Sequence, residues 1–246
     1  MTQHDELTPT LGDLSGTSLA TIAEMTPRAP AVLESFGLDY CCGGATTLAV
    51  ACEEVGASPT LVTDELAKVA QVEPDGRNDY ADMDPAELTV HLESVHHSYL
   101  HEEMPRLDAL AEKVATVHGE NHPELLEVRR LYRELYADLQ PHLLKEEQVL
   151  FPMIRELVEN EGNAEFHCGS LSNPISVMMS EHDRDGELLA ELRSVTDGYA
   201  TPDDGCASYK ALYDGLAELE RDTHLHIHKE NNILFPAVVA LESANT

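Results

Sequence analysis

Apolar residues recur every three or four positions along most of the second half of the chain, which is the pattern of amphipathic helices. The pattern predicts long helices over residues 85–117, 123–160, 174–197 and 203–242. The connections between them are short and rich in turn residues, and no segment alternates like a strand. Four such helices form an antiparallel four-helix bundle, so the expected fold class is all-α.

A smaller helical unit is expected before the bundle. Between residues 18 and 72 the helical patterns are short and are interrupted by proline and glycine. Residues 1–17 are polar and predict a loose tail, and the aperiodic stretch 73–84 predicts a linker. The linker ends at Asp84, which is followed by proline and, three residues on, by glutamate, a typical helix start. We therefore expect a small helical domain over 18–72 and the bundle over 85–242.

An internal repeat indicates where the chemistry of the bundle lies. The segment HLLKEEQVLFP, which begins at His142, recurs 84 residues later as HIHKENNILFP from His226. Each copy has a histidine upstream on the preceding predicted helix. His97 lies 45 residues before His142, and His182 lies 44 residues before His226. The bundle therefore looks like two similar helical hairpins.

The spacing within the repeat places a carboxylate beside each histidine. Residues four apart share a helix face, so His142 and Glu146 point the same way, as do His226 and Glu230. Four imidazoles and two carboxylates can then converge inside the bundle. The predicted metal ligands are His97, His142, Glu146, His182, His226 and Glu230. This mixture suits two iron or manganese ions rather than structural zinc, and a carboxylate on each of two facing helices can bridge them.

The alternative is that these residues bind no metal. A single histidine and glutamate four residues apart usually form a solvated pair, and the Leu-Phe-Pro that follows could be plain core. Two copies with matched upstream histidines favour the metal site. Glu181, beside His182, is either a residue that supports a ligand from behind or an exposed helix glutamate.

The other histidines divide by direction. His101 shares a face with His97 and is a spare ligand candidate, whereas His91 and His96 stay ambiguous. Both His224 and His228 differ from His226 by about 200° and are expected at the surface. The histidines in predicted tails and turns, expected to be solvated, are His4, His118, His122 and His167. The prolines expected to kink helices or relax their hydrogen bonds are Pro105, Pro141, Pro152 and Pro236.

The chain has five cysteines, and two of them, Cys41 and Cys42, are adjacent. Two glycines follow, and then a helix is predicted from Ala45, whose dipole would favour a thiolate. A glycine turn with two small buried residues, or a strained bond between the neighbouring cysteines, would also fit. Cys52 is expected in the core, whereas Cys168 and Cys206 carry no decisive signal.

The charge balance limits the kinds of partner. The 46 acidic and 15 basic side chains leave 31 excess negative charges, which argues against nucleic acid or an anionic membrane as the main partner. No apolar run approaches the roughly 18 residues that span a bilayer. The N-terminus lacks a signal pattern, so a cytoplasmic location is expected.

The combination of motifs resembles a known family. LDYCCGG, followed by HHSYLHEEMP, HLLKEEQVLFP, SEHDRDGELL and HIHKENNILFP, is similar to the iron–sulfur cluster repair di-iron proteins, the YtfE/ScdA or RIC family. The resemblance covers nearly the whole chain from about residue 18. The bundle alone resembles hemerythrin-like domains in general, and LDYCCGG narrows the resemblance to the repair family. The resemblance implies that the six predicted ligands hold two iron ions per chain, with Glu146 and Glu230 bridging, and that residues 18–72 form a ScdA-type domain.

The same resemblance implies a function. The family implies a homodimer that restores iron–sulfur clusters after oxidative or nitrosative damage, by donating iron or by reductive handling of nitric oxide. Its partners would be proteins with damaged clusters, with nitric oxide or O₂ as small ligands. We expect Cys41 and Cys42 to receive iron, carry electrons or dock the target. The alternatives are a hemerythrin-like O₂ or NO carrier or sensor without repair activity, and a nitric oxide reductase whose effect on clusters is indirect. The paired thiols favour repair.

Overall fold

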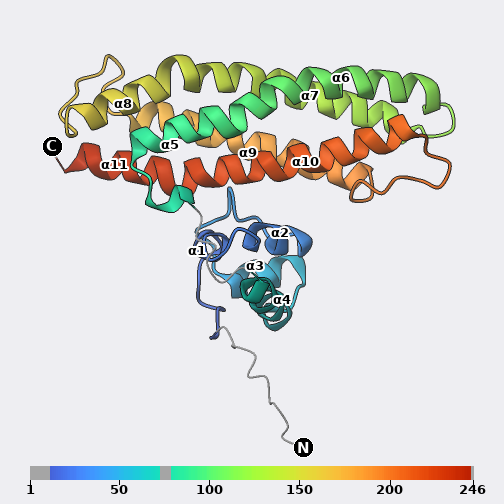
Figure 1. Ribbon diagram of the computed structural model, residues 1–246, viewed down its shortest axis with the longest axis horizontal. Helices are drawn as coiled ribbons and strands as arrows, with labels where there is room; N and C mark the ends of the chain where they lie inside the picture. The colour runs from blue at the N-terminus through green and yellow to red at the C-terminus, as the bar shows by residue number, and fades with distance from the viewer. Residues whose placement is uncertain (1–11, 73–78, 245–246) are drawn as a thin grey trace, which may run out of the picture. The chain divides into compact units, whose positions relative to one another are not determined.

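The computed structural model describes residues 12–72 and 79–244 (Figure 1). The outer part of the expected tail, with His4, and residues 73–78 of the expected linker lie outside the described residues. Within the described ranges the chain is helical and contains no strand, only two isolated bridges between single residues. The all-α prediction is confirmed. The chain divides into two compact units between Asp82 and Met83.

The N-terminal unit is built from short helices around its own apolar core. Its elements are α1 (Leu19–Ala23), α2 (Ala29–Ser35), α3 (Leu48–Val55), α4 (Pro59–Val72) and the 3₁₀ turn η1 (Asp79–Asp82). The Ser18 side chain caps α1 by accepting from the backbone N–H of Thr21. Cys52 is fully buried in this core, as expected. Helix α3 begins at Leu48, three residues later than Ala45, because residues 43–47 form a turn and the cap of the helix.

The second unit is a bundle of four long helical segments (Figure 1). The first contains α5 (Pro85–Leu92), η2 (Glu93–His97) and α6 (Ser98–His118); the second contains α7 (Glu124–Lys145), η3 (Glu146–Leu150) and α8 (Phe151–Glu159). The third is α9 (Ser172–Val195), and the fourth contains α10 (Ala207–Lys229), η4 (Glu230–Leu234) and α11 (Phe235–Ser243). The predicted ends agree to within four residues. Asp84 and Glu87 form the expected capping box at the start of α5.

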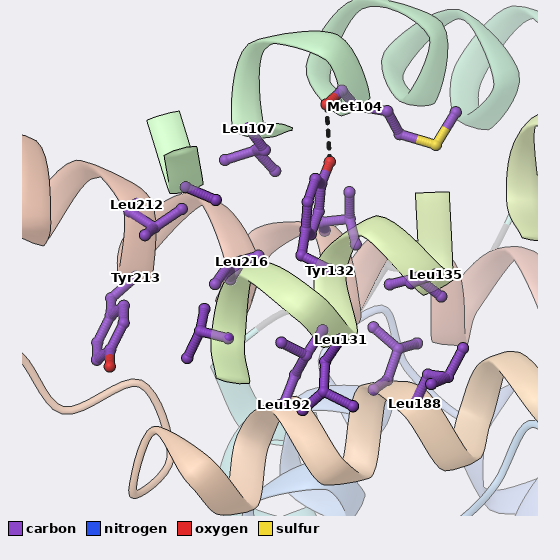
Figure 2. Close-up of a cluster of buried hydrophobic side chains, with 14 of the residues drawn as sticks. Met104, Leu107, Leu131, Tyr132, Leu135, Leu188, Leu192, Leu212, Tyr213 and Leu216 are labelled. Atoms are coloured by element: carbon purple, nitrogen blue, oxygen red, sulfur yellow. Dashed lines mark hydrogen bonds between the residues drawn. The ribbon is translucent and has the colours of Figure 1, made fainter. Parts of the chain in front are cut away.

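Leucine and tyrosine side chains fill the half of the bundle that lies toward the turn after α6. Figure 2 shows this cluster, in which the Tyr132 hydroxyl donates a 2.8 Å hydrogen bond to the Met104 carbonyl and so links α7 to α6. The cluster runs from Leu100 on the first segment and ends at Leu143 on the second. The predicted ligands begin where this apolar cluster ends. No helix among the described residues is long and apolar enough to cross a bilayer.

Candidate metal centre

Three of the bundle's helical segments widen into a π-helical turn at the level of the predicted ligands. Glu146 and Glu230 each begin such a turn, η3 and η4, and His97 ends the turn η2. The backbone N–H that closes a π turn reaches five residues back, from Phe151 to Glu146 and from Phe235 to Glu230. Such turns insert one residue into a helix and are frequent at functional sites.

The prolines of the repeat explain two of these turns. Pro152 and Pro236 stand just beyond η3 and η4 and have no N–H to continue an α-helical ladder. The expectation that prolines relax the helices near ligands is confirmed for these two. Pro105 and Pro141 lie inside α6 and α7, which stay α-helical around them. The Leu-Phe-Pro of the repeat therefore sets helix geometry as well as filling the core.

The structure brings all six predicted ligands together, and each is at most 1% exposed. They form two groups, and within each group the ligand atoms all lie within 4.8 Å of one another. Both groups contain Glu146 and Glu230. We call the group with His97 and His226 position 1. The group with His142 and His182 is position 2. Their binding of metal stays a prediction.

The imidazole pairs have the separation that one ion requires. His97 Nε2 lies 3.2 Å from His226 Nε2 in position 1, and His142 Nε2 lies 3.1 Å from His182 Nε2 in position 2. Two nitrogens bound to one ion at about 2.1 Å lie about 3.0 Å apart at right angles and about 3.4 Å apart in a tetrahedron. The observed distances fall between these limits.

The two carboxylates each span both positions. One oxygen of each glutamate faces an imidazole of position 1, and its other oxygen faces an imidazole of position 2. The distances are 3.5 Å for Glu146 Oε2 to His97 Nε2, 3.2 Å for Glu146 Oε1 to His142 Nε2, 3.2 Å for Glu230 Oε1 to His226 Nε2 and 3.1 Å for Glu230 Oε2 to His182 Nε2. Two carboxylates so placed could each bridge a pair of ions, and the bridging role of Glu146 and Glu230 stays a prediction.

The electrostatics of the centre call for a cation. Among the described residues, the four oxygens of Glu146 and Glu230 have no hydrogen-bond partner of good geometry, although both side chains are fully buried. Burial opposes a charge on His142, but Glu146 and Glu230 outweigh it and raise the pKa of His142 to about 10. Burial acts against ionisation of Glu230 too, yet His226 and His182 hold its pKa well below the usual range. Buried carboxylates without donors are costly unless paired with positive charge, so the residues present fit bound metal ions.

Side chains behind the ligands fix the direction of three imidazoles. Each Nδ1 is held by an oxygen acceptor: His97 by Glu147 at 3.0 Å, His142 by Glu181 at 2.8 Å and His182 by Asn231 at 2.8 Å. An Nδ1–H that donates outward leaves the Nε2 lone pair facing the centre. Glu181 therefore lies where a supporting residue was expected, and it also forms an ion pair with Lys145.

Glu147 and Asn231 were missed by the sequence reasoning. The signal was available, because each directly follows a ligand glutamate at the same place in the repeat. His101 does not join either group: its Nε2 lies 2.7 Å from Glu147 and its side chain is 43% exposed. The spare ligand candidate instead supports the residue that orients His97.

A second buried polar cluster flanks position 1. The Lys229 ammonium lies 2.7 Å from His96 Nε2 and 2.8 Å from His91 Nε2, and His96 Nδ1 lies 2.8 Å from Asp222. The His96 ring stacks on that of His226, with centroids 5.3 Å apart. Burial lowers the pKa of His96 to about 4 and that of Lys229 to about 8. A neutral His96 can thus accept from Lys229 and donate to Asp222.

Two unexpected polar side chains lie one turn from the ligands. Asp185 follows His182 by three residues and Thr223 precedes His226 by three, and both are buried. Their side-chain oxygens have no hydrogen-bond partner among the described residues. Burial raises the pKa of Asp185 to about 7. The hydrophobic pattern did not predict a buried polar side chain at either position, because both are core positions of their helices.

The surface expectation for His228 is wrong. His228 is fully buried, and every residue of 226–230 is buried, whereas His224 is half-buried. The direction argument assumed that only one face of this helix is covered. At this turn the helix is enclosed on all sides, and the His228 ring accepts a 3.3 Å hydrogen bond from Asn232.

The adjacent cysteines lie in a turn organised by Asp39. Cys41 is 4% exposed, Cys42 is more open, and their sulfurs are 3.8 Å apart, compared with about 2.05 Å in a disulfide. The expected thiolate is not favoured at Cys41. Cys42, burial and Asp39 together raise the pKa of the Cys41 thiol, and α3 begins only at Leu48, so its dipole is remote.

Comparison with known proteins agrees with this architecture. The hemerythrin HHE cation binding domain family matches residues 88–238, and the ScdA_N family, described as a domain of unknown function (DUF542), matches residues 15–70. The chain is 36% identical over 222 residues to a probable iron-sulfur cluster repair protein of Haemophilus influenzae, covering 90% of this chain and 96% of the relative. It is 36% identical over 226 residues to the iron-sulfur cluster repair protein YtfE of Escherichia coli O81 (strain ED1a) and to that of Escherichia fergusonii, covering 91% of this chain and 97% of each relative.

Both units of the chain thus match family domains, and the alignment with a relative covers nine-tenths of the chain. The chain belongs to the family of iron–sulfur cluster repair proteins.

Proposed function

We propose that this protein is a di-iron protein that restores iron–sulfur clusters damaged by oxidative or nitrosative stress. The observation that carries the proposal is the pair of buried four-residue groups that share Glu146 and Glu230. Membership of the repair family and the match to a cation-binding domain support iron as the metal. His97, His142, Glu146, His182, His226 and Glu230 would hold two iron ions per chain.

Iron bound there would supply redox chemistry and coordination positions for nitric oxide or O₂. The protein's own part is to hold the ligands ready. Glu146 and Glu230 each belong to both positions, so loss of either carboxylate would weaken both. Glu147, Glu181 and Asn231 keep three imidazoles aimed at the centre.

In the repair reaction, iron itself is the cargo that reaches a damaged cluster. Of the six ligands only two carry charge, so the centre holds its ions less permanently than an all-carboxylate or all-thiolate site. The N-terminal domain, over 18–72, would bring Cys41 and Cys42 as the thiols that receive iron, and 73–84 would link it to the bundle over 85–242. A cytoplasmic homodimer is part of the same proposal.

Two other functions use the same centre. A hemerythrin-like carrier or sensor would bind O₂ or nitric oxide without repair, and a nitric oxide reductase would protect clusters indirectly. The His/Glu centre alone serves either function, whereas the paired thiols of the Asp39 turn favour repair. Anaerobic incubation of the reduced protein with nitric oxide, with N₂O as the measured product, separates the reductase from the iron donor.

The decisive experiment follows labelled iron from the loaded protein into a dehydratase whose cluster has been damaged. We expect transfer and recovered dehydratase activity with the wild-type protein, and loss of both in the double variant Cys41→Ser with Cys42→Ser. Cys206→Ser is the matched control, because it removes a thiol of the other unit. Unchanged repair by the double variant refutes the thiol role, and recovery without label transfer refutes iron donation.

A further inference from the structure

The turn that carries the adjacent cysteines has the geometry of a metal site of its own. Asp39, Cys41 and Cys42 offer ligand atoms that all lie within 4.8 Å of one another. We infer that this turn binds one thiophilic divalent ion, Zn²⁺ or Fe²⁺, through the two thiolates and the Asp39 carboxylate. The inference stands on the geometry of the turn and does not depend on the function proposed for the bundle.

The separation of the two sulfurs matches that on a tetrahedral ion. Two thiolates bound at about 2.3 Å in a tetrahedron lie about 3.8 Å apart, and a thiolate and a carboxylate oxygen on the same ion lie about 3.5 Å apart. The Cys41 and Cys42 sulfurs are 3.8 Å apart, and Cys41 Sγ lies 3.2 Å from Asp39 Oδ1. The thiols are therefore already spaced as an ion would hold them, although no disulfide bond joins them.

The backbone fixes the carboxylate that would complete the site. Asp39 Oδ1 accepts from the backbone N–H groups of Cys41 at 3.1 Å and Cys42 at 2.9 Å, and Oδ2 accepts from that of Gly43 at 2.9 Å. Each carboxylate oxygen has about two acceptor positions, so the backbone fills both on Oδ1, which also faces the Cys41 thiol, and one position stays open on Oδ2 for an ion. Partners of this kind orient metal ligands and tune their affinity.

The close packing around Gly43 explains why a glycine directly follows the cysteines. A Cβ at this position would lie 2.8 Å from the Asp39 carbonyl oxygen and 3.2 Å from Asp39 Oδ2. Only glycine therefore lets the backbone close around the carboxylate. A pocket of about 120 Å³, lined in part by Leu38, Asp39 and Gly43, opens on the Asp39 side of the turn.

Binding exchanges protons for the ion. The two thiols release two protons, and the dication then meets two thiolates and one carboxylate, which leaves a net charge of minus one on the site. These three side chains supply three ligands, and a fourth comes from water or from another protein. Because the thiols must ionise, affinity rises with pH.

Cobalt(II) tests the site, since thiolate ligands give it a charge-transfer absorption that imidazole and carboxylate ligands do not. In the full-length protein, with its bundle already loaded with iron, we expect this absorption to saturate at one added Co²⁺ per chain and to be displaced by Zn²⁺ or Fe²⁺. Cys42→Ser should abolish the absorption, and Asp39→Asn should weaken Co²⁺ binding about 70- to 900-fold. Cys206→Ser and Cys52→Ser are the controls and should leave it unchanged.

A further variant distinguishes metal bound in the bundle from metal bound at the cysteine turn. Glu146→Leu with Glu230→Leu should lose the metal of the bundle and keep the thiolate absorption, and circular dichroism confirms that each variant is folded. Absence of the absorption in the wild-type protein overturns the inference, as does its loss in Cys206→Ser or its persistence in Cys42→Ser. Failure of both Zn²⁺ and Fe²⁺ to displace Co²⁺ overturns it as well.

Discussion

The shared carboxylates predict that Glu146 and His142 differ in how much metal each one controls. Glu146 belongs to both groups, whereas His142 belongs only to position 2. A four-ligand metal site contributes about 10–16 kcal/mol of binding free energy, which is about 2.5–4 kcal/mol per ligand. Losing one ligand therefore weakens a position about 70- to 900-fold.

Applied to the two variants, this magnitude gives different iron counts. Glu146→Leu should weaken both positions and leave close to no iron after dialysis against a moderate chelator. His142→Leu should weaken position 2 and leave one iron per chain, compared with two in the wild-type protein. Metal analysis per chain, with protein concentration from amino-acid analysis, measures these counts.

The neighbouring glutamate supplies the matched control. Glu147 contacts His97 and His101 but lies outside both groups, so Glu147→Gln should keep two irons and lower affinity only about 10–100-fold. Two irons in Glu146→Leu, or the same count in Glu146→Leu and His142→Leu, would refute the bridging assignment.

Three further predictions concern other parts of the chain. Burial raises the pKa of Asp185 to about 7, so the stability of the metal-free protein should fall between about pH 4 and pH 7 by up to roughly 4 kcal/mol. Asp185→Asn should remove this loss, which urea titrations at pH 4 and pH 8 measure; equal stability of the two proteins at pH 8 contradicts it. The backbone N–H of Tyr209 and the His118 ring, 3.1 Å away, lower the pKa of Cys206 to about 7, so alkylation should modify Cys206 first and His118→Ala should slow it at neutral pH. Preferential labelling of another cysteine contradicts this. Tyr132→Phe removes the hydrogen bond to the α6 backbone and should lower the free energy of unfolding by about 1 kcal/mol, against no change if that bond is dispensable.

The sequence was sufficient for the fold and for the meeting of the six predicted ligands, because both follow from periodicity. Helix ends came from capping signals such as Asp84, and the shared face of His142 and Glu146 came from their spacing. The repeat then related the two hairpins without any knowledge of their packing.

Periodicity gives the direction of a side chain and not its depth, and this accounts for what the sequence reasoning missed. The Lys229–His96 contact joins residues 133 positions apart, so no local pattern could indicate it. Asp185 is polar at a core position, and only tertiary packing buries it. His228 was assigned to the surface because a helix was assumed to have an exposed face. The role of Asp39 at the cysteine turn depends on backbone N–H directions, which the residue types do not encode.

The π turns have a consequence for how the chain tolerates insertions and deletions. Each residue advances a helix by about 100°, so the extra residue of η3 sets which side of α8 faces inward. Ile154 and Leu157 are fully buried in that register. Deleting Gln148 would restore an ordinary helix but would swing both side chains away from the interior. The length of each ligand-bearing segment is therefore tied to the packing of its buried side chains. An insertion or deletion of one residue there should lower the stability of the protein even if no ligand is lost.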